Sequence, residues 1–145
     1  MREVVFTRSN WMPSVVTVDG VLRLVVVGGA DALHGPREFT VPISEECGGV
    51  LRDSLARHLL LHSALLPLCD AAGIRRPWDE GAAAALLVPV LLGTHDEVDA
   101  LFARIRWNRR LLLAHGASLS LLDQGRVVEA TMSAKERADW SRVPR

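Results

Sequence analysis

The sequence contains no tyrosine, only two cysteines, a single lysine (Lys135) and no excess of charge of either sign. The absence of tyrosine removes one common general acid. The two cysteines do not have the Cys-x-x-Cys spacing of a typical metal-binding pair. The seventeen basic and seventeen acidic side chains balance, so no overall electrostatic field directs the protein to nucleic acid or to an acidic membrane surface.

Long hydrophobic runs are also missing. The longest apolar stretch, residues 82–92, contains Pro89 and is shorter than the roughly 18 residues that a membrane span requires. The N-terminal residues Met1-Arg2-Glu3-Val4 lack the apolar run and the small-residue cleavage site of a signal peptide. We therefore expect a cytoplasmic protein without a membrane partner, in which both thiols stay reduced.

Length and pattern together predict the fold class. A chain of 145 residues with 49% hydrophobic residues fits a single domain over residues 1–145, large enough to bury a core. The pattern changes near Ser44, from a strand region (1–44) to a helical region (45–145). The strands are expected at 3–8, 14–18, 21–27 and 37–43, with Asp19-Gly20 as a hairpin turn. The sequence thus predicts an α+β fold, in which a four-stranded antiparallel meander precedes four or five helices packed on one sheet face.

The predicted sheet is apolar on both faces. Leu24 and Val26 point to one side, and Val25 and Val27 point to the other, while Arg23 is the polar exception in that strand. Such a sheet is either covered twice or pairs with a second copy of itself. Because the helices cover one face, we expect a homo-oligomer that forms through the other.

Capping residues divide the helical region. Ser44, followed by two glutamates, begins a helix that bends at Pro67 and ends at Gly73. Asp79 begins a very apolar helix that is interrupted at Pro89 and is expected in the middle of the helical layer. A further helix is expected over 94–115, where Thr94 and Glu97 form a capping box. Two more are expected to begin at Ser118 and at Ser133, and Ser133 forms a second capping box with Glu136.

Two histidines and a cysteine share the apolar face of the first helix. His58, His62 and Cys69 fall within about 40° of one another at helical spacing, and burying polar groups without partners costs free energy. The i, i+4 spacing makes His58 and His62 candidate metal ligands, although Leu59 stands where a zincin requires glutamate. Alternatively, the histidines bond backbone carbonyls and the cysteine acts as a small hydrophobe.

A pocket beside the histidines is a further possibility. Cys47 and Gly48 extrapolate to the same side as His58, and the alanines at 82–85 remove side-chain volume. In such a pocket His58 would act as general base and Cys47 as nucleophile, but small residues also permit close helix packing. The candidate catalytic residues are thus His58, His62 and Cys47. The sequence leaves open whether the protein is an enzyme, and no cofactor is expected.

The densest basic segment is residues 104–110, which contains four arginines and Trp107. Such a run can contact phosphates, but its arginines spread around the helix, so nucleic-acid binding is not expected. Arg109 aligns with apolar positions and should reach the core edge. There it requires a carboxylate, with Asp70, Asp79 and Glu80 as candidates.

Three segments carry a resemblance to a known group of proteins: REFTVPIS (37–44), RHLLL (57–61) and LLPLCDAAG (65–73). They look like a family of small actinobacterial proteins of unknown function. The resemblance covers most of the chain, agrees with a cytoplasmic setting and implies no catalytic residue, cofactor or partner. The sequence favours a non-catalytic protein-binding or self-associating module. The alternative is a small-molecule or metal-binding pocket, or an enzyme, that uses His58 and His62 with a nearby cysteine.

Overall fold

Four antiparallel strands open the chain, as the sequence predicts. The computed structural model describes residues 1–9, 12–30, 33 and 35–132. Its strands β1 (Arg2–Phe6), β2 (Ser14–Val18), β3 (Val21–Gly28) and β4 (Arg37–Pro42) form one sheet in the order β1-β2-β3-β4. Asp19 (φ 52°) and Gly20 (φ 80°) make the β2–β3 turn. Both are left-handed, as a two-residue hairpin turn requires.

Helices follow the sheet, so the α+β prediction is confirmed. The described residues contain seven helices, more than four or five, because two of the predicted helices are broken and a short further helix, residues 127–131, follows the one that begins after Ser118. At Ser54 the backbone turns extended and the side chain caps a new helix by accepting from the Arg57 amide. The 94–115 helix is broken at residues 103–108, and the Asn108 amide donates to the Ser63 carbonyl instead. The helices are α1 (Glu45–Asp53), α2 (Leu55–Ala72), α3 (Glu80–Leu92), α4 (His95–Phe102), α5 (Arg109–Ala114), α6 (Leu119–Asp123) and α7 (Val127–Thr131).

The helix caps predicted at Ser44, Asp79 and Thr94 are present in the structure. Ser44 accepts from the Cys47 amide, Asp79 caps α3, and Thr94 and Glu97 form the capping box of α4. Helix α3 continues through Pro89 to Leu92 and is not interrupted there. The helix predicted from Ser133 lies outside the described residues.

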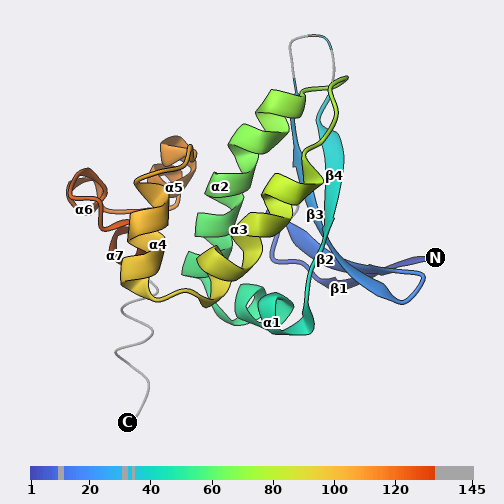
Figure 1. The fold of residues 1–145 in the computed structure, drawn as a ribbon, viewed down its shortest axis with the longest axis horizontal. Helices are drawn as coiled ribbons and strands as arrows, with labels where there is room; N and C mark the ends of the chain where they lie inside the picture. The colour runs from blue at the N-terminus through green and yellow to red at the C-terminus, as the bar shows by residue number, and fades with distance from the viewer. Residues whose placement is uncertain (10–11, 31–32, 34, 133–145) are drawn as a thin grey trace.

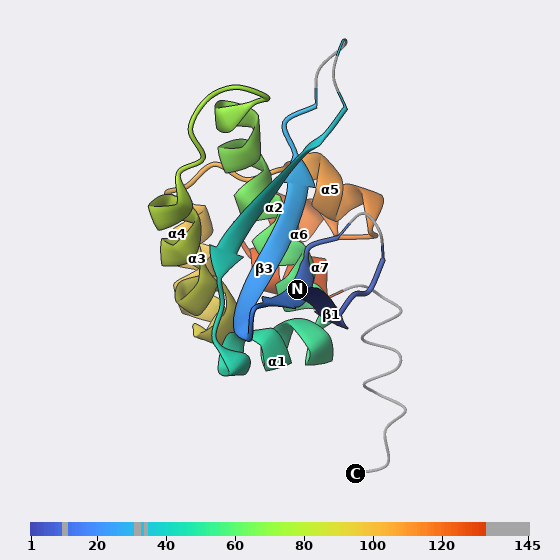
Figure 2. The same ribbon diagram turned by 90° about the vertical axis from the view of Figure 1, so that its right-hand side faces the viewer.

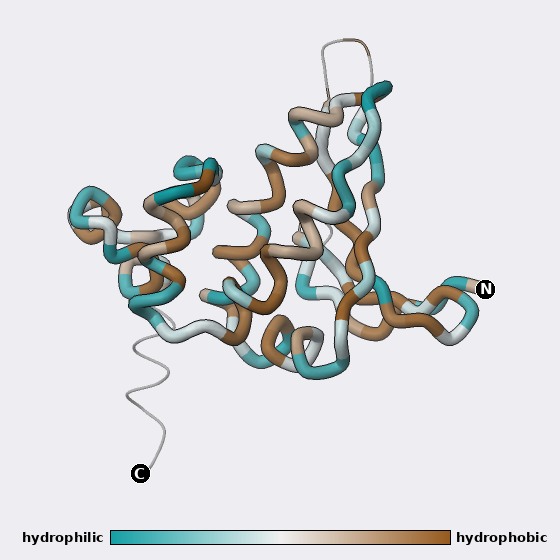
Figure 3. Tube along the Cα trace, viewed as in Figure 1, coloured by the Kyte–Doolittle hydropathy of each residue, from teal (hydrophilic) through white to brown (hydrophobic). Residues whose placement is uncertain are grey.

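The elements stack in three layers, with the sheet on one side, α2 and α3 in the middle and α4–α7 on the far side (Figure 1). Seen from the sheet, the helices lie behind β3 and β4 (Figure 2). Hydrophobic segments concentrate in β3 and the middle layer, and hydrophilic segments are frequent in the outer helices (Figure 3). Eleven of the eighteen α2 residues are buried, because α2 packs against the sheet on one side and against α5 and α7 on the other.

The burial of the middle layer corrects one expectation in part. The sequence predicts that the apolar helix after Asp79 is buried in the middle, and α3 does lie in the middle layer (Figure 1), but its Val88 and Leu92 are exposed. The longer, leucine-rich α2 is the buried helix of this layer because it carries large apolar side chains on all sides from Leu59 to Leu65. Helix α3 lies at its flank and leaves an apolar strip in solvent.

The second apolar face of the sheet is partly covered by the chain itself. Val16 and Val25 point away from the helices, yet they are 0% and 4% exposed. Arg2 of β1 forms an ion pair with Glu38 of β4, although these outer strands would lie roughly 14 Å apart in a flat sheet. The sheet therefore coils, and β1 passes in front of β3 (Figure 2). Met12, also buried, lines a small hollow on this face together with Val25.

Helix α2 touches the sheet most closely at Gly28. A Cβ atom there would lie 2.8 Å from the Cys69 Cβ and 3.4 Å from its Sγ. Real Cβ atoms do not approach other atoms so closely, so β3 can cross α2 at this distance only with glycine in that position. The close approach is what buries Cys69 completely.

We predict that Gly28→Ala lowers the free energy of unfolding by about 1–3 kcal/mol, because the new methyl group forces β3 and α2 apart. Urea unfolding followed by circular dichroism measures the change. Gly35→Ala is the matched control, since a Cβ at Gly35 meets nothing within 4 Å. Equal stability of the two variants would contradict the close-packing role of Gly28.

Candidate functional site

His58 lies fully buried, and both ring nitrogens have partners. Its Nε2 is 2.7 Å from the Pro13 carbonyl oxygen, and the Arg8 Nε–H donates to its Nδ1 at 3.3 Å. Because Arg8 must donate, Nδ1 accepts and Nε2 carries the proton given to Pro13. Arg8 also donates through Nη2 to the Leu51 and Arg52 carbonyls at 2.9 Å each. His58 therefore joins the β1–β2 connection to the end of α1.

The surroundings keep His58 neutral. The pKa of His58 is lowered to about 4, mainly by burial; the bond to the Pro13 carbonyl acts in the opposite direction, and the Arg8 charge adds to the lowering. The Pro13 carbonyl is the kind of partner expected if His58 has a structural role, because that alternative pairs the histidine with a backbone carbonyl. A neutral imidazole can act as a base, but proton transfer at His58 would first have to break one of these two bonds.

His62, one turn further along α2, has an unpartnered nitrogen. The ring is 5% exposed, and its buried Nδ1 has no hydrogen-bond partner among the residues that the structure describes. The pKa of His62 is lowered to about 4, mainly by burial, with smaller contributions in the same direction from His58 and His115. His58 thus disfavours the protonation of His62, as expected for neighbours without a carboxylate between them.

The two histidines are not joined by a third ligand. Within the residues that the structure describes, no three His, Cys, Asp or Glu side chains are placed to hold a metal ion. The metal hypothesis for His58 and His62 thus lacks the further ligands that a zinc site uses.

Both thiols lie in the hydrophobic core. Cys47 is buried in the first turn of α1, where its amide donates to Ser44 Oγ. Cys69 is buried two turns beyond His62. The pKa of the Cys69 thiol is raised to about 12, mainly by burial and also by the Asp70 carboxylate. A thiol protonated at neutral pH is a poor nucleophile, so Cys69 has the chemistry of a packing residue.

A cleft does open near Cys47, at the glycines that the sequence singles out. Gly48 and Gly49 line a cleft of about 430 Å³ together with Phe6, Leu22 and others. Phe6, whose ring centroid lies 5.9 Å from that of His58, lines this cleft, whereas Cys47 and His58 are not among its lining residues. The small residues thus create space at the surface of the sheet, apart from the histidines.

Arg109 pairs with a different carboxylate from those expected. Asp70, Asp79 and Glu80 are the candidates from sequence, but the ion pair is made with Asp123. The break at residues 103–108 is the reason, because it starts α5 at Arg109 as a separate helix. The pair is partly exposed, so its contribution to stability is small.

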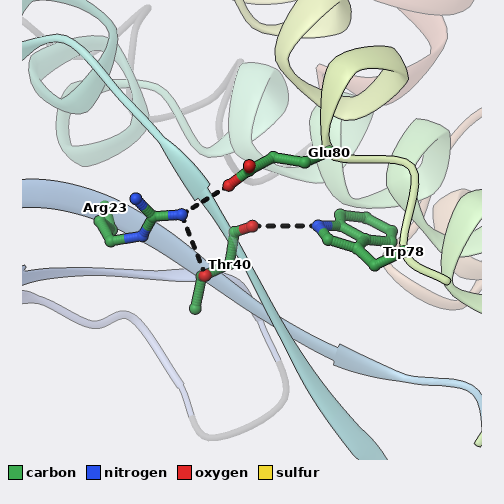
Figure 4. Close-up of polar contacts among 4 residues, drawn as sticks. All are labelled: Arg23, Thr40, Trp78 and Glu80. Carbon is green, nitrogen blue, oxygen red and sulfur yellow. Dashed lines mark hydrogen bonds and ion pairs between the residues drawn. The ribbon is translucent and has the colours of Figure 1, made fainter.

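Glu80 instead belongs to a polar cluster that fastens α3 to the sheet (Figure 4). The Arg23 guanidinium lies 2.5 Å from Glu80 Oε1 and 3.2 Å from Thr40 Oγ1. The Trp78 indole N–H donates to the Thr40 carbonyl at 3.0 Å. The one polar residue among the β3 hydrophobes thus has a structural partner that sequence periodicity does not identify.

A concave region lies elsewhere, over the C-terminal half of α2. A cleft of about 770 Å³ is lined by Asp70, Trp107 and the arginines of the basic segment, among others. A second, apolar groove of about 500 Å³ runs between α2 and α3. Sequence patterns missed both hollows, because the cleft forms between two segments distant in sequence and the groove among three. The dense basic segment was the available signal.

The observations define a class of protein: a small α+β domain with a coiled four-stranded sheet, a buried histidine pair and an arginine-lined surface cleft. The chain belongs to a family of unknown function, DUF6357, whose model matches residues 1–145. This confirms the resemblance to a family of unknown function. No curated protein and no solved structure matches the chain. Among the described helices, none combines the length and hydropathy needed to cross a bilayer.

The histidine pair predicts an acid-sensitive fold. Both pKa values are about 4 in the folded protein and about 6.5 in the unfolded chain. Between these values the unfolded state binds more protons, so stability falls as pH decreases from 6.5 to 4. The loss is at most about 3 kcal/mol per histidine over the whole interval. Chemical denaturation at a series of pH values measures it.

His62→Leu should remove one histidine's share of this pH dependence, while the exposed His95→Gln should leave it unchanged. Retention of the full wild-type slope by His62→Leu would show that His62 is not buried in its neutral form.

Proposed function

We propose that the protein is a non-catalytic binding module that associates with a second copy of itself through the outer sheet face at β1. The observation that supports this is the difference between the two edges of the sheet. One edge is covered by the chain's own side chains, and the other is exposed together with apolar residues.

The β4 edge is covered. The Trp78 indole donates to the Thr40 carbonyl (Figure 4), and the rings of Trp78 and Phe39 stack with centroids 4.6 Å apart. Arg37 donates to the Arg76 carbonyl at 2.7 Å, which holds the segment after α2 against this strand. Pro42 ends β4 without an amide proton to offer. A second chain therefore has little access here.

The β1 edge is open. Within the described residues no strand pairs with its outer side, and Arg2 to Val5 are exposed. Val4 (64% exposed) lies beside Val16 on the outer face, where Val21 and Val27 are also exposed. Exposed edges next to apolar side chains are templates for strand addition. Two copies related by a two-fold axis would bury the same valines from both sides.

The interior candidates support a binding role over catalysis. The nitrogens of His58 bond Arg8 and Pro13, and Cys47 and Cys69 are buried. In this proposal His58, His62 and Cys47 stabilise the sheet that presents the β1 edge and do not act as reacting groups.

We expect a dimer whose dissociation constant rises at least tenfold in Val4→Lys, because the substitution places two like charges in a symmetric contact. Size-exclusion chromatography with light scattering, over a concentration series, measures the association. Val88→Lys on α3 is the matched control, since Val88 is exposed to a similar degree and lies away from β1. A wild-type protein that stays monomeric at millimolar concentration, or equal effects of the two lysines, would contradict the proposal.

A further inference from the structure

The apolar groove between α2 and α3 is unlike the other hollows of the surface. It measures about 500 Å³, within the roughly 300–1,000 Å³ of small-ligand sites. Ala64 forms part of its wall from α2, and Ala82 and Ala85 do so from α3, while Leu68 and Leu86 are half-buried along it. The small alanine side chains create the space, and the leucines supply apolar contact along it.

The groove adjoins the arginine-lined cleft. Pro67, Ala71, Ile105 and Arg106 line both hollows, so the two adjoin along these residues, beside the C-terminal half of α2, which is the upper half of that helix in Figure 1. We refer to the two hollows together as the depression. The groove has a single charged lining residue, Arg106, and it stands at this junction. Apolar surface therefore meets positive charge at one defined place.

Among the described residues that line the cleft, arginines outnumber carboxylates. Within the described residues, neither Arg106 nor Arg110 has a carboxylate at salt-bridge distance, and Arg109 is shared with Asp123. One carboxylate, Asp70, lines the cleft with these three arginines. Guanidinium groups bind carboxylates by paired hydrogen bonds, so the charge complements an anionic head group.

We propose that this depression binds a single-chain alkyl carboxylate, with the hydrocarbon chain along the α2–α3 groove and the carboxylate at Arg106, supported by Arg109 and Arg110. The binding involves no covalent step. It is independent of the proposed dimer, because the residues that line the depression lie on α2, α3, the α4–α5 connection and the start of α5, and none lies on β1.

Isothermal titration calorimetry with alkyl carboxylates below their micellar concentration tests the proposal. Each methylene added between hexanoate and decanoate should tighten binding about threefold to fourfold, because about 0.8 kcal/mol is gained per buried methylene. Acetate, which has the head without the chain, should not bind measurably. Decanol, which has the chain without the charge, should bind more weakly than decanoate by about tenfold, and only decanoate should weaken as salt is added.

Two pairs of variants locate the ligand. Arg106→Gln should weaken decanoate at least tenfold and leave decanol unchanged, whereas Arg104→Gln, two residues earlier and outside the depression, should change neither. Ala85→Trp should fill the groove and abolish binding of both ligands. Ala84→Trp places the same ring on an exposed neighbouring position of α3 and should not. Melting temperatures confirm that each variant is folded.

Three results would overturn the proposal: no decanoate binding by the wild-type protein, equal binding by Ala85→Trp, or equal decanoate affinity in Arg106→Gln. An acidic amphipathic peptide is titrated in parallel. Peptide binding without decanoate binding would assign the groove to a protein helix and would also overturn the proposal. Repeating the titration with Val4→Lys separates this result from dimerisation, since loss of the dimer should leave decanoate affinity unchanged.

Discussion

The burial of α2 between the sheet and the outer helices is the constraint on which the rest of the structure depends. A helix covered on two sides depends on the protein interior for partners to its polar groups, and His62 Nδ1 is an exception that finds none among the described residues. His58 has its partners in Pro13 and Arg8, and the Ser63 hydroxyl donates to the Leu60 carbonyl. The Ser63 carbonyl in turn accepts from the Asn108 amide, which fixes the start of α5. The polar residues of α2 thus position the segments on both of its sides.

Arginines connect these layers at the ends of helices. Arg8 donates to the last carbonyls of α1, Arg57 donates to the Val90 and Gly93 carbonyls at the end of α3, and Arg37 bonds the Gly73 and Arg76 carbonyls beyond α2. Unsatisfied carbonyls at a helix C-terminus carry partial negative charge, and one guanidinium can bond two of them at once. The near absence of lysine therefore agrees with the way the chain uses its cations.

The parts of the fold that could be predicted are those with local causes. Asp19-Gly20 predicts its own turn, and Ser44, Asp79 and Thr94 predict the helices that they cap, because the bonding groups lie within a few residues. The helix breaks at Ser54 and at 103–108 could not be predicted from periodicity, since the bonds that compensate them come partly from other segments. The candidate residues divide in the same way. Helical spacing places His58 and His62 on one face, but the Arg8 partner of His58 lies fifty residues away in the chain.

The sequence by itself determined the fold class, the strand order and the helix caps, because turn and cap chemistry acts over short distances. It also determined that the sheet would be apolar on both faces and that titratable groups would enter the core. Only the tertiary structure decided how these demands are met. The sheet coils so that Arg2 reaches Glu38 over Val16 and Val25, and α2 rather than α3 is the buried helix of the middle layer. Packing between distant segments likewise decided that the charged cleft forms beside Arg106, with a lining that does not include the histidines. Local sequence spacing carries no information about such long-range contacts.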